Sequence, residues 1–185
     1  MEFTEEDLVR RARGRDRDAF RQLVERYRER VYGIARGMTG NHADADDVAQ
    51  ETFIRAYRKL DDFEGRARFC TWLYRIAVNC SLDLLRKRLR RAEFDLGDAG
   101  GVEGLAAAGG RHGGDGAAHR ELIEAIARGI ESLPERHRAV LVLHDLEGLP
   151  HDEIGAVLGC SPGTVRSRLH YARRRMQRKL RGFLG

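Results

Sequence analysis

Apolar residues recur every three or four positions along most of the chain, a spacing that gathers them on one face of an α-helix. The clearest stretch begins at Asp16 or Asp18, either of which can cap a helix. Its apolar face consists of Phe20, Leu23, Val24, Tyr27, Val31 and Ile34. Strand-like alternation of apolar and polar residues does not interrupt this pattern, so we predict an all-α protein.

The apolar repeats and their capping residues predict two groups of helices. The first group covers residues 5–13, a longer helix from residue 16 or 18 past residue 34, and residues 43–60 and 69–91. A loop that contains Gly65 is expected at residues 61–68. The second group covers residues 121–132, 134–146, 151–158 and 162–180.

The composition changes sharply between the two groups. Residues 92–119 contain nine glycines and few large apolar side chains. Such a segment buries too little apolar surface to fold by itself. We therefore expect two small helical domains, residues 1–91 and 120–185, joined by a flexible Gly-rich linker at residues 92–119.

Positive charge is concentrated at the C-terminal end of the chain. The net charge is only +5, but the residues after Cys160 include eight Lys or Arg and no Asp or Glu. Ser161 can cap a helix there, Pro162 suits its first position, and Gly159 supplies a turn after residues 151–158. Two helices joined in this way predict a helix-turn-helix, whose second helix reads base edges in the major groove of DNA.

The surface of this second helix is the candidate duplex-binding face. Its members are Thr164, Arg166, Ser167, His170, Tyr171, Arg173 and Arg174. The alternative is an ordinary solvated face, but such a face normally mixes both signs of charge.

The helix at residues 43–60 has a polar side with one apolar exception. Its buried side is predicted to contain Ala45, Ala49, Phe53, Ala56, Tyr57 and Leu60, and the opposite side presents Asp47, Gln50, Glu51 and Ile54. An apolar residue inside a polar rim is typical of a protein interface. The competing interpretation is again a solvated face.

The helix at residues 69–91 carries an aromatic and basic row beside its apolar stripe. This row consists of Trp72, Arg75, Asn79 and Arg86, and Arg66 and Arg68 precede it in the loop. Aromatic side chains stack unpaired bases while cations neutralise phosphates, so the row is a candidate single-stranded DNA site. Trp72 is equally compatible with a place in the core.

Other kinds of chemistry are poorly supported. Cys70, Cys80 and Cys160 lack metal-ligand spacing, and no arrangement of nucleophile and base is present, so we expect no metal, no cofactor and no enzyme activity. The carboxylates of residues 44, 46 and 47 splay around a helix, which disfavours one shared ion. Neither a signal peptide nor an apolar run of ~18 residues is present, so we expect a cytoplasmic protein without membrane insertion. One candidate function for the whole chain is therefore a free-standing helix-turn-helix regulator, and it is the main alternative to the function that the motifs below imply.

Several motifs together resemble one family. They are DADDVAQETFIRAY at residues 44–57, FCTWLYRIAVN at 69–79, LPERHRAV at 133–140 and GTVRSRL at 163–169. In this order they closely resemble bacterial RNA polymerase sigma factors of the extracytoplasmic-function group. The chain departs from the usual family sequence at Pro150, where a Ser or Thr cap is common, at Gly155, and in the Gly-rich linker.

The resemblance implies a function for each predicted face. Residues 1–91 are similar to sigma region 2, in which Asp47, Gln50 and Glu51 match positions that dock on the clamp helices of polymerase core. Trp72, Arg75 and Asn79 match positions that capture a flipped base of the minus-ten element. Residues 120–185 are similar to region 4, which reads the minus-35 duplex. The partners implied are the clamp helices and flap of the core enzyme, promoter DNA and an anti-sigma protein.

Overall fold

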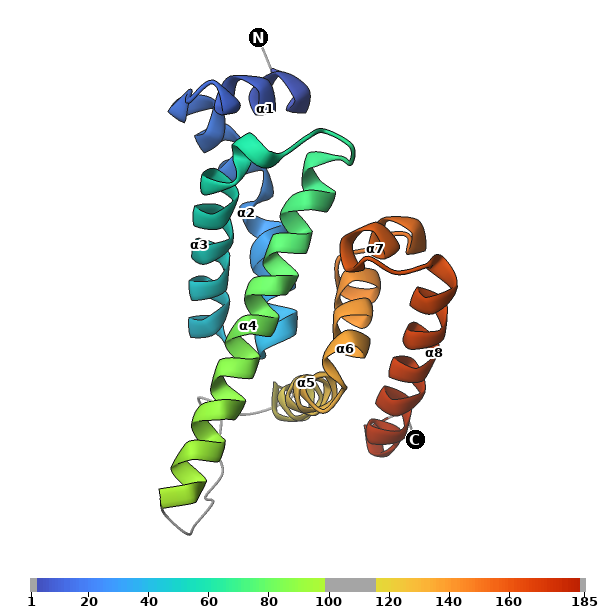
Figure 1. The fold of residues 1–185 in the computed structure, drawn as a ribbon. Coiled ribbons are helices and arrows are strands. Elements are labelled where there is room, and N and C mark those ends of the chain that lie inside the picture. The colour runs from blue at the N-terminus through green and yellow to red at the C-terminus, as the bar shows by residue number, and fades with distance from the viewer. Residues whose placement is uncertain (1–2, 99–115, 184–185) are drawn as a thin grey trace.

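The computed structural model describes residues 3–98 and 116–183, and within these ranges the chain is helical and contains no strand. Four helices form the N-terminal half: α1 (Glu5–Arg13), α2 (Arg17–Thr39), α3 (His42–Arg58) and α4 (Phe69–Asp98). A 3-10 turn, η1 (Leu60–Asp62), follows α3. The all-α prediction is confirmed (Figure 1).

The C-terminal half contains α5 (Gly116–Glu131), α6 (Glu135–Leu141), α7 (His151–Leu158) and α8 (Pro162–Lys179). Where one helix was predicted at residues 134–146, α6 passes into a π-helical turn, η2 (Val142–Leu146). A short 3-10 turn, η3 (Arg181–Phe183), follows α8. None of the helices in the described ranges is long and apolar enough to cross a membrane.

The ends of the expected linker are helical. Residues 92–98 continue α4, and residues 116–119 belong to the first turn of α5. The prediction of a flexible segment from 92 to 119 was therefore too long at both ends. The central part, residues 99–115, lies outside the described residues.

Side chains of α2 lie at the centre of the N-terminal domain. Leu23, Val31 and Ile34 are almost fully buried, as the apolar repeat predicted. Asp16, rather than Asp18, caps this helix, since its carboxylate accepts from the N–H groups of Asp18 and Ala19. The first turn of α4 closes the core with Phe69, whose ring lies 5.7 Å from those of Tyr27 and Phe63.

The helix-turn-helix has the predicted geometry. The Ser161 hydroxyl accepts from the N–H of Thr164 and starts α8, and Gly159 makes the turn with a left-handed φ of 64°. The apolar stripe of α8 is buried against α6 and α7. Its members are Val165, Leu169, Ala172 and Met176.

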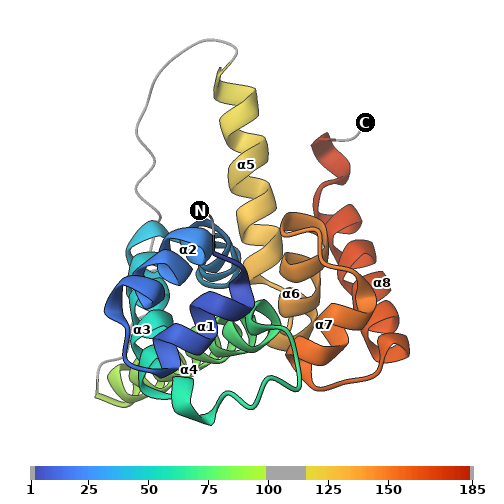
Figure 2. The ribbon, with the colours of Figure 1, turned by 90° about the horizontal axis from the view of Figure 1, so that it is seen from above.

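The two domains pack against each other. Figure 1 shows α4 facing α6 and α7, and Figure 2 shows α5 between the two groups of helices. Most of the buried apolar residues of the two domains form one continuous cluster, and a smaller cluster lies beside it in the N-terminal domain. At this boundary Arg138, which is 8% exposed, donates to the backbone oxygens of Met38, Glu131 and Leu133.

Gly155→Ala is expected to lower the free energy of unfolding, although alanine favours helix. A Cβ at this position would lie 2.7 Å from the carbonyl oxygen of Cys160. Relieving that overlap shifts the backbone between α7 and α8, at a cost of about 1–3 kcal/mol. Urea unfolding measures the change.

The matched control is Gly163→Ala in the first turn of α8, where a Cβ would meet only the Ser161 hydroxyl, at 3.8 Å. This variant is expected to be as stable as the wild type or about 1 kcal/mol more stable. Equal stability of the two alanine variants would show that Gly155 is not needed for the turn.

Candidate functional site

The predicted protein-binding face lies on α3. Asp47, Gln50 and Ile54 are exposed there, and Ile54 retains 38% of its accessible surface. Glu51 is half-buried because Arg55 binds it, with 2.6 Å between Nε and Oε1. Arg55 also reaches Asp83 of α4 at 3.0 Å, and these two hydrogen bonds raise the pKa of its guanidinium. Arg55 therefore links Glu51 on this face to Asp83 of α4 and restrains the Glu51 carboxylate.

An apolar groove of about 470 Å³ runs beside this face. Side chains of α2 and α3 line it: Phe20, Val24, Gln50, Phe53, Ile54, Tyr57 and Arg58. Tyr57 was predicted to be buried, but it is 37% exposed and packs with its ring 4.9 Å from that of Phe20. The contributions of Phe20 and Val24 were missed, since the α2 repeat placed both residues in the core.

The aromatic and basic row lies on one flank of α4. We call Trp72, Arg75, Asn79 and Arg86 the α4 flank. Trp72 is half-buried and packs 5.2 Å from Phe63 and 5.6 Å from Phe69. It also lines a hollow of about 200 Å³ between the loop at residues 62–67 and Arg75. The part of Trp72 that packs on Phe63 and Phe69 fits the core interpretation, and base stacking stays a prediction for the part that lines the hollow.

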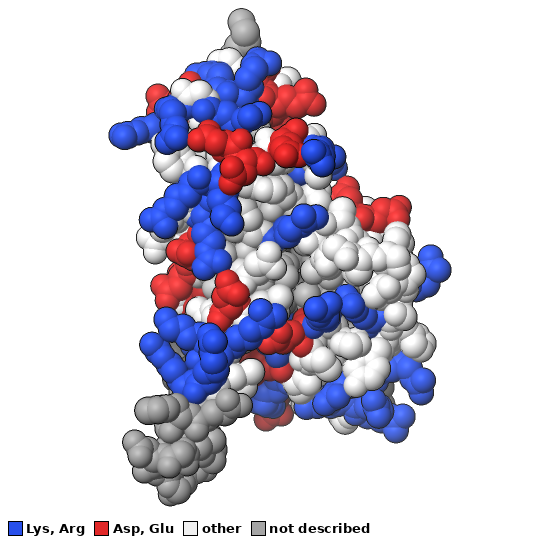
Figure 3. Space-filling view, viewed as in Figure 1, with Lys and Arg blue, Asp and Glu red and all other residues white. Residues whose placement is uncertain are grey.

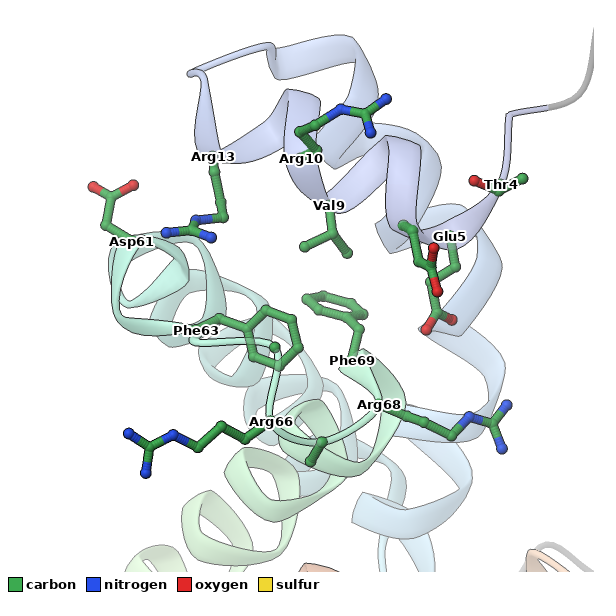
Figure 4. Close-up of a pocket in the computed structure, with 13 residues that line it drawn as sticks. Thr4, Glu5, Val9, Arg10, Arg13, Asp61, Phe63, Arg66, Arg68 and Phe69 are labelled. Atoms are coloured by element: carbon green, nitrogen blue, oxygen red, sulfur yellow. The ribbon is translucent and has the colours of Figure 1, made fainter.

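A larger hollow of about 1280 Å³ separates α1 from the loop before α4. Figure 4 shows the rings of Phe63 and Phe69 beneath Val9 of α1, while Arg66 and Arg68 point away from each other. Arg66 pairs with Glu64 at 2.6 Å. The loop therefore does not gather both arginines beside Trp72.

The C-terminal domain contacts the α4 flank. Arg75 donates to the carbonyl oxygens of Ala156 and Val157, the latter at 3.3 Å, at the end of α7. Nearby, Arg68 pairs with Glu153 at 3.2 Å and Arg86 pairs with Glu135 at 3.6 Å. These contacts were not predicted, because residues 68 and 153 are far apart in the sequence.

The predicted duplex-binding face of α8 is mostly open. Arg166, Ser167, His170 and Arg174 are exposed, while the half-buried Thr164 serves mainly to start the helix. Figure 3 shows Lys and Arg gathered over α8 and over the C-terminal part of α4.

Two residues of the predicted α8 face have partners within the domain. The ring of Tyr171 lies 4.6 Å from that of His137. Arg173 binds Asp145 in η2, with 3.0 Å between Nε and Oδ2. Burial alone would raise the pKa of Asp145, but hydrogen bonds from Arg173 and His144 outweigh it and lower that pKa.

The acidic residues at the start of α3 are separated in space. Asp44 is 7% exposed and pairs with Arg88 of α4 at 2.5 Å. Asn41 donates to the same carboxylate at 2.7 Å. Asp46 and Asp47 are exposed. Within residues 3–98 and 116–183, no group of three His, Cys, Asp or Glu side chains is placed to hold a metal ion.

Comparison with known proteins identifies the family. The model of sigma-70 region 2 matches residues 23–91, and the model of sigma-70 region 4 matches residues 123–176. The chain is 36% identical over 186 residues to the ECF RNA polymerase sigma factor SigW of Bacillus subtilis, covering 98% of this chain and 99% of that protein. It is 38% identical over 183 residues to the ECF RNA polymerase sigma-E factor of Escherichia coli K12, covering 97% and 95%.

Solved structures agree with this assignment. CnrH in complex with the cytosolic domain of CnrY matches with a TM-score of 0.70 and 30% identity, over 95% of this chain and 96% of that one. The sigma factor RpoE in complex with the anti-sigma factor NepR from Bartonella quintana matches with a TM-score of 0.67 and 25% identity, over 88% and 96%. The chain belongs to the extracytoplasmic-function (ECF) group of RNA polymerase sigma factors, which are non-catalytic specificity subunits of transcription initiation.

Asp145→Asn is expected to lower the free energy of unfolding by about 0.5–1 kcal/mol at neutral pH, because a partly exposed ion pair is lost. The folded-state pKa of Asp145 is depressed, so its stabilising effect is present above the unfolded pKa of about 3.9. The difference from the wild type is expected to persist from about pH 5 to 7 and to shrink as the pH falls through the folded pKa.

Urea unfolding at several pH values measures this difference. Glu29→Gln is the matched control, since Glu29 is an exposed carboxylate on α2. A difference for Asp145→Asn that stays constant down to pH 3 would contradict the role given to this ion pair.

Proposed function

We propose that this chain binds RNA polymerase core and directs it to specific promoters, which the holoenzyme then opens. The observation that carries the proposal is that two arginine-bearing surfaces, on α4 and on α8, lie in separate domains that the models of regions 2 and 4 match in order. An ordinary operator-binding regulator needs only the second of these faces.

Core polymerase is proposed to dock on α3 and its apolar groove. Ile54 and Tyr57 supply exposed apolar surface, and Asp47, Gln50 and Glu51 surround it with polar groups. An apolar centre within a polar rim is the usual composition of a protein interface. The flap of the core enzyme is proposed as a second contact, for the C-terminal domain.

The minus-ten strand is proposed to bind along the α4 flank. The hollow beside Trp72 offers an aromatic wall and the guanidinium of Arg75, which suit an unstacked base and its phosphate. Asn79 and Arg86 extend the same row, and Arg66 and Arg68 supply further cations from the loop.

The minus-35 duplex is proposed to bind α8. Arg166, Ser167 and His170 lie in its exposed N-terminal half, the part that enters the major groove in a helix-turn-helix. Tyr171 borders this surface. Arg174 and the later basic residues are assigned to phosphates, and Arg173 would contact DNA only after leaving Asp145.

An anti-sigma protein is proposed as a regulator. One solved relative, RpoE, is bound to the anti-sigma factor NepR. Such a partner is proposed to bind the apolar groove on α2 and α3, where it would compete with polymerase. We propose a cytoplasmic location, because a polymerase subunit acts on DNA there.

The main alternative is a regulator that binds DNA without polymerase. It accounts for α8 but assigns no role to the groove beside Ile54 or to the hollow beside Trp72. Adding the chain to purified core polymerase separates the two functions. We expect transcription from specific promoters in a genomic library. Protection of a duplex by the chain alone, with no effect on core, would support the alternative.

Ile54→Asp is expected to reduce transcription from all promoters alike, by tenfold or more at limiting protein concentration, because a buried charge without a partner opposes docking. Binding of fluorescent chain to core measures the affinity directly. Leu89→Asp is the matched control, since Leu89 is 59% exposed on α4, away from the groove. Full core affinity of the Ile54 variant would remove α3 from the interface.

Arg166→Ala is expected to weaken use of one minus-35 sequence by about 1–3 kcal/mol and to leave core binding intact, because one base contact is lost. Transcription from a set of promoters with single changes in the minus-35 element measures the loss. Arg178→Ala, at the other end of α8, should weaken all sequences by a similar factor. An equal loss of transcription from every promoter in the set would instead indicate that Arg166 binds a phosphate.

A further inference from the structure

A cavity of about 350 Å³ lies between α4 of the N-terminal domain and the helices α6, α7 and α8. Four arginines line it, Arg75 and Arg86 from the N-terminal domain and Arg136 and Arg168 from the C-terminal domain. Glu135 is the one carboxylate among the described residues of the lining. Each domain therefore brings two cations to the same space, and like charges that face each other across an interface oppose its formation.

The charges of the exposed arginines are only partly neutralised. Arg86 pairs with Glu135 at 3.6 Å, and Arg75 donates to backbone oxygens at the end of α7. Among residues 3–98 and 116–183, the side chain of Arg136 has no hydrogen-bond or ion-pair partner. Donor groups of all three side chains are therefore accessible to a bound anion.

Arg168 is the most enclosed of the four arginines. It is half-buried, and its guanidinium reaches only the sulfur of Cys160, at 3.6 Å, which is a weak acceptor. Burial lowers the pKa of the His137 imidazole, and the nearby charge of Arg168 lowers it further. Partial burial of a cation without an acidic partner has a cost in free energy, which a bound anion would offset.

We propose that this interdomain cavity binds a nucleoside polyphosphate. The planar guanidinium group donates two parallel hydrogen bonds to a phosphate, so arginines from both domains suit a chain of two or three phosphates. The bound nucleotide joins the two domains. This site is separate from the duplex-binding face of α8 and from the groove beside Ile54.

The other part of the lining is apolar and favours a ligand that is more than a simple anion. Val78 and Leu82 line the cavity from α4, and Ala139 and Leu158 line it from the C-terminal domain. Asn79 offers a donor and an acceptor for the edge of a base. Small-molecule sites usually have a volume of about 300–1,000 Å³ and combine apolar walls with a few polar groups. A nucleotide fits both parts of the lining, whereas inorganic phosphate leaves the apolar walls in contact with water.

The alternative is that these arginines bind only the DNA strand. That use accounts for Arg75 and Arg86, which belong to the α4 flank. It assigns no role to Arg136 and Arg168, which line the cavity from the other domain. A small ligand contacts both pairs at once.

Calorimetric titration of the full chain with ATP, without added magnesium, tests the proposal. Arg136→Gln and Arg168→Gln are each expected to weaken binding about tenfold, because each removes charge-assisted hydrogen bonds to phosphate. Arg28→Gln is the matched control, since Arg28 is an exposed arginine of α2 that does not line the cavity. It is expected to weaken binding less than about twofold, through screened long-range charge alone.

Glu135→Gln tests the same site by a gain of affinity. This change removes the carboxylate from the lining and frees Arg86 for the ligand. ATP is expected to bind this variant about threefold or more tightly, because a like charge near the phosphates is removed. Glu29→Gln makes the same charge change on the exposed surface of α2 and should leave the affinity unchanged within about 1.5-fold. The gain remains measurable even if an arginine variant fails to fold.

Adenosine and pyrophosphate separate the two parts of the ligand. Each is expected to bind at least about tenfold more weakly than ATP, since each fills only the apolar or only the charged part of the lining. Pyrophosphate that binds as tightly as ATP would overturn the assignment of a nucleotide.

Three further results would overturn the proposal. They are the absence of ATP binding to the wild type, an equal loss in Arg28→Gln and the two cavity arginine variants, and an unchanged affinity in Glu135→Gln. Binding of a labelled single-stranded DNA 20-mer without any binding of ATP would assign the arginines to DNA alone. Transcription with core polymerase is measured separately and tests only the proposed function.

Discussion

The arrangement of the whole molecule depends on one buried guanidinium. Arg138 lies where α2 and α5 both end, and it donates to the carbonyl oxygens of Met38 and Glu131. The C-terminal end of a helix carries partial negative charge, so the cation satisfies acceptors that burial would otherwise leave unpaired. Burial lowers the pKa of Arg138, and the nearby Glu131 and Glu135 oppose that shift. This contact fixes α6 against α2, and α6 in turn places η2 and α7.

Domain docking decides which surfaces can bind a partner. The groove beside Ile54 faces solvent, and so does the N-terminal half of α8 around Arg166 and His170. On the α4 flank, Arg75 donates to the end of α7, but Arg75, Asn79 and Arg86 are all exposed.

The sequence was sufficient for the elements that local chemistry determines. The repeat in α2, the Ser161 cap and the Gly159 turn depend on neighbours a few residues away, and all were predicted correctly. The exposure of Tyr57, the π-helical turn and the contacts of Arg75 depend on residues far away in the chain, and these were missed. Gly155 stood out in the sequence only as a weak helix former, whereas the structure shows that its missing Cβ makes room for the carbonyl of Cys160.

The distance between the domains, measured before and after promoter binding, tests the account most directly. Spin labels at Lys59 and Lys179, both exposed, report it by pulsed electron paramagnetic resonance once Cys160 is replaced by serine. We expect a narrow distance distribution for the free chain. In the complex with core polymerase and promoter DNA the distance should lengthen by tens of ångströms, toward the roughly 85 Å that separates the two promoter elements. An unchanged distance between the two labels in an active complex would contradict simultaneous binding of the two promoter elements by the two domains.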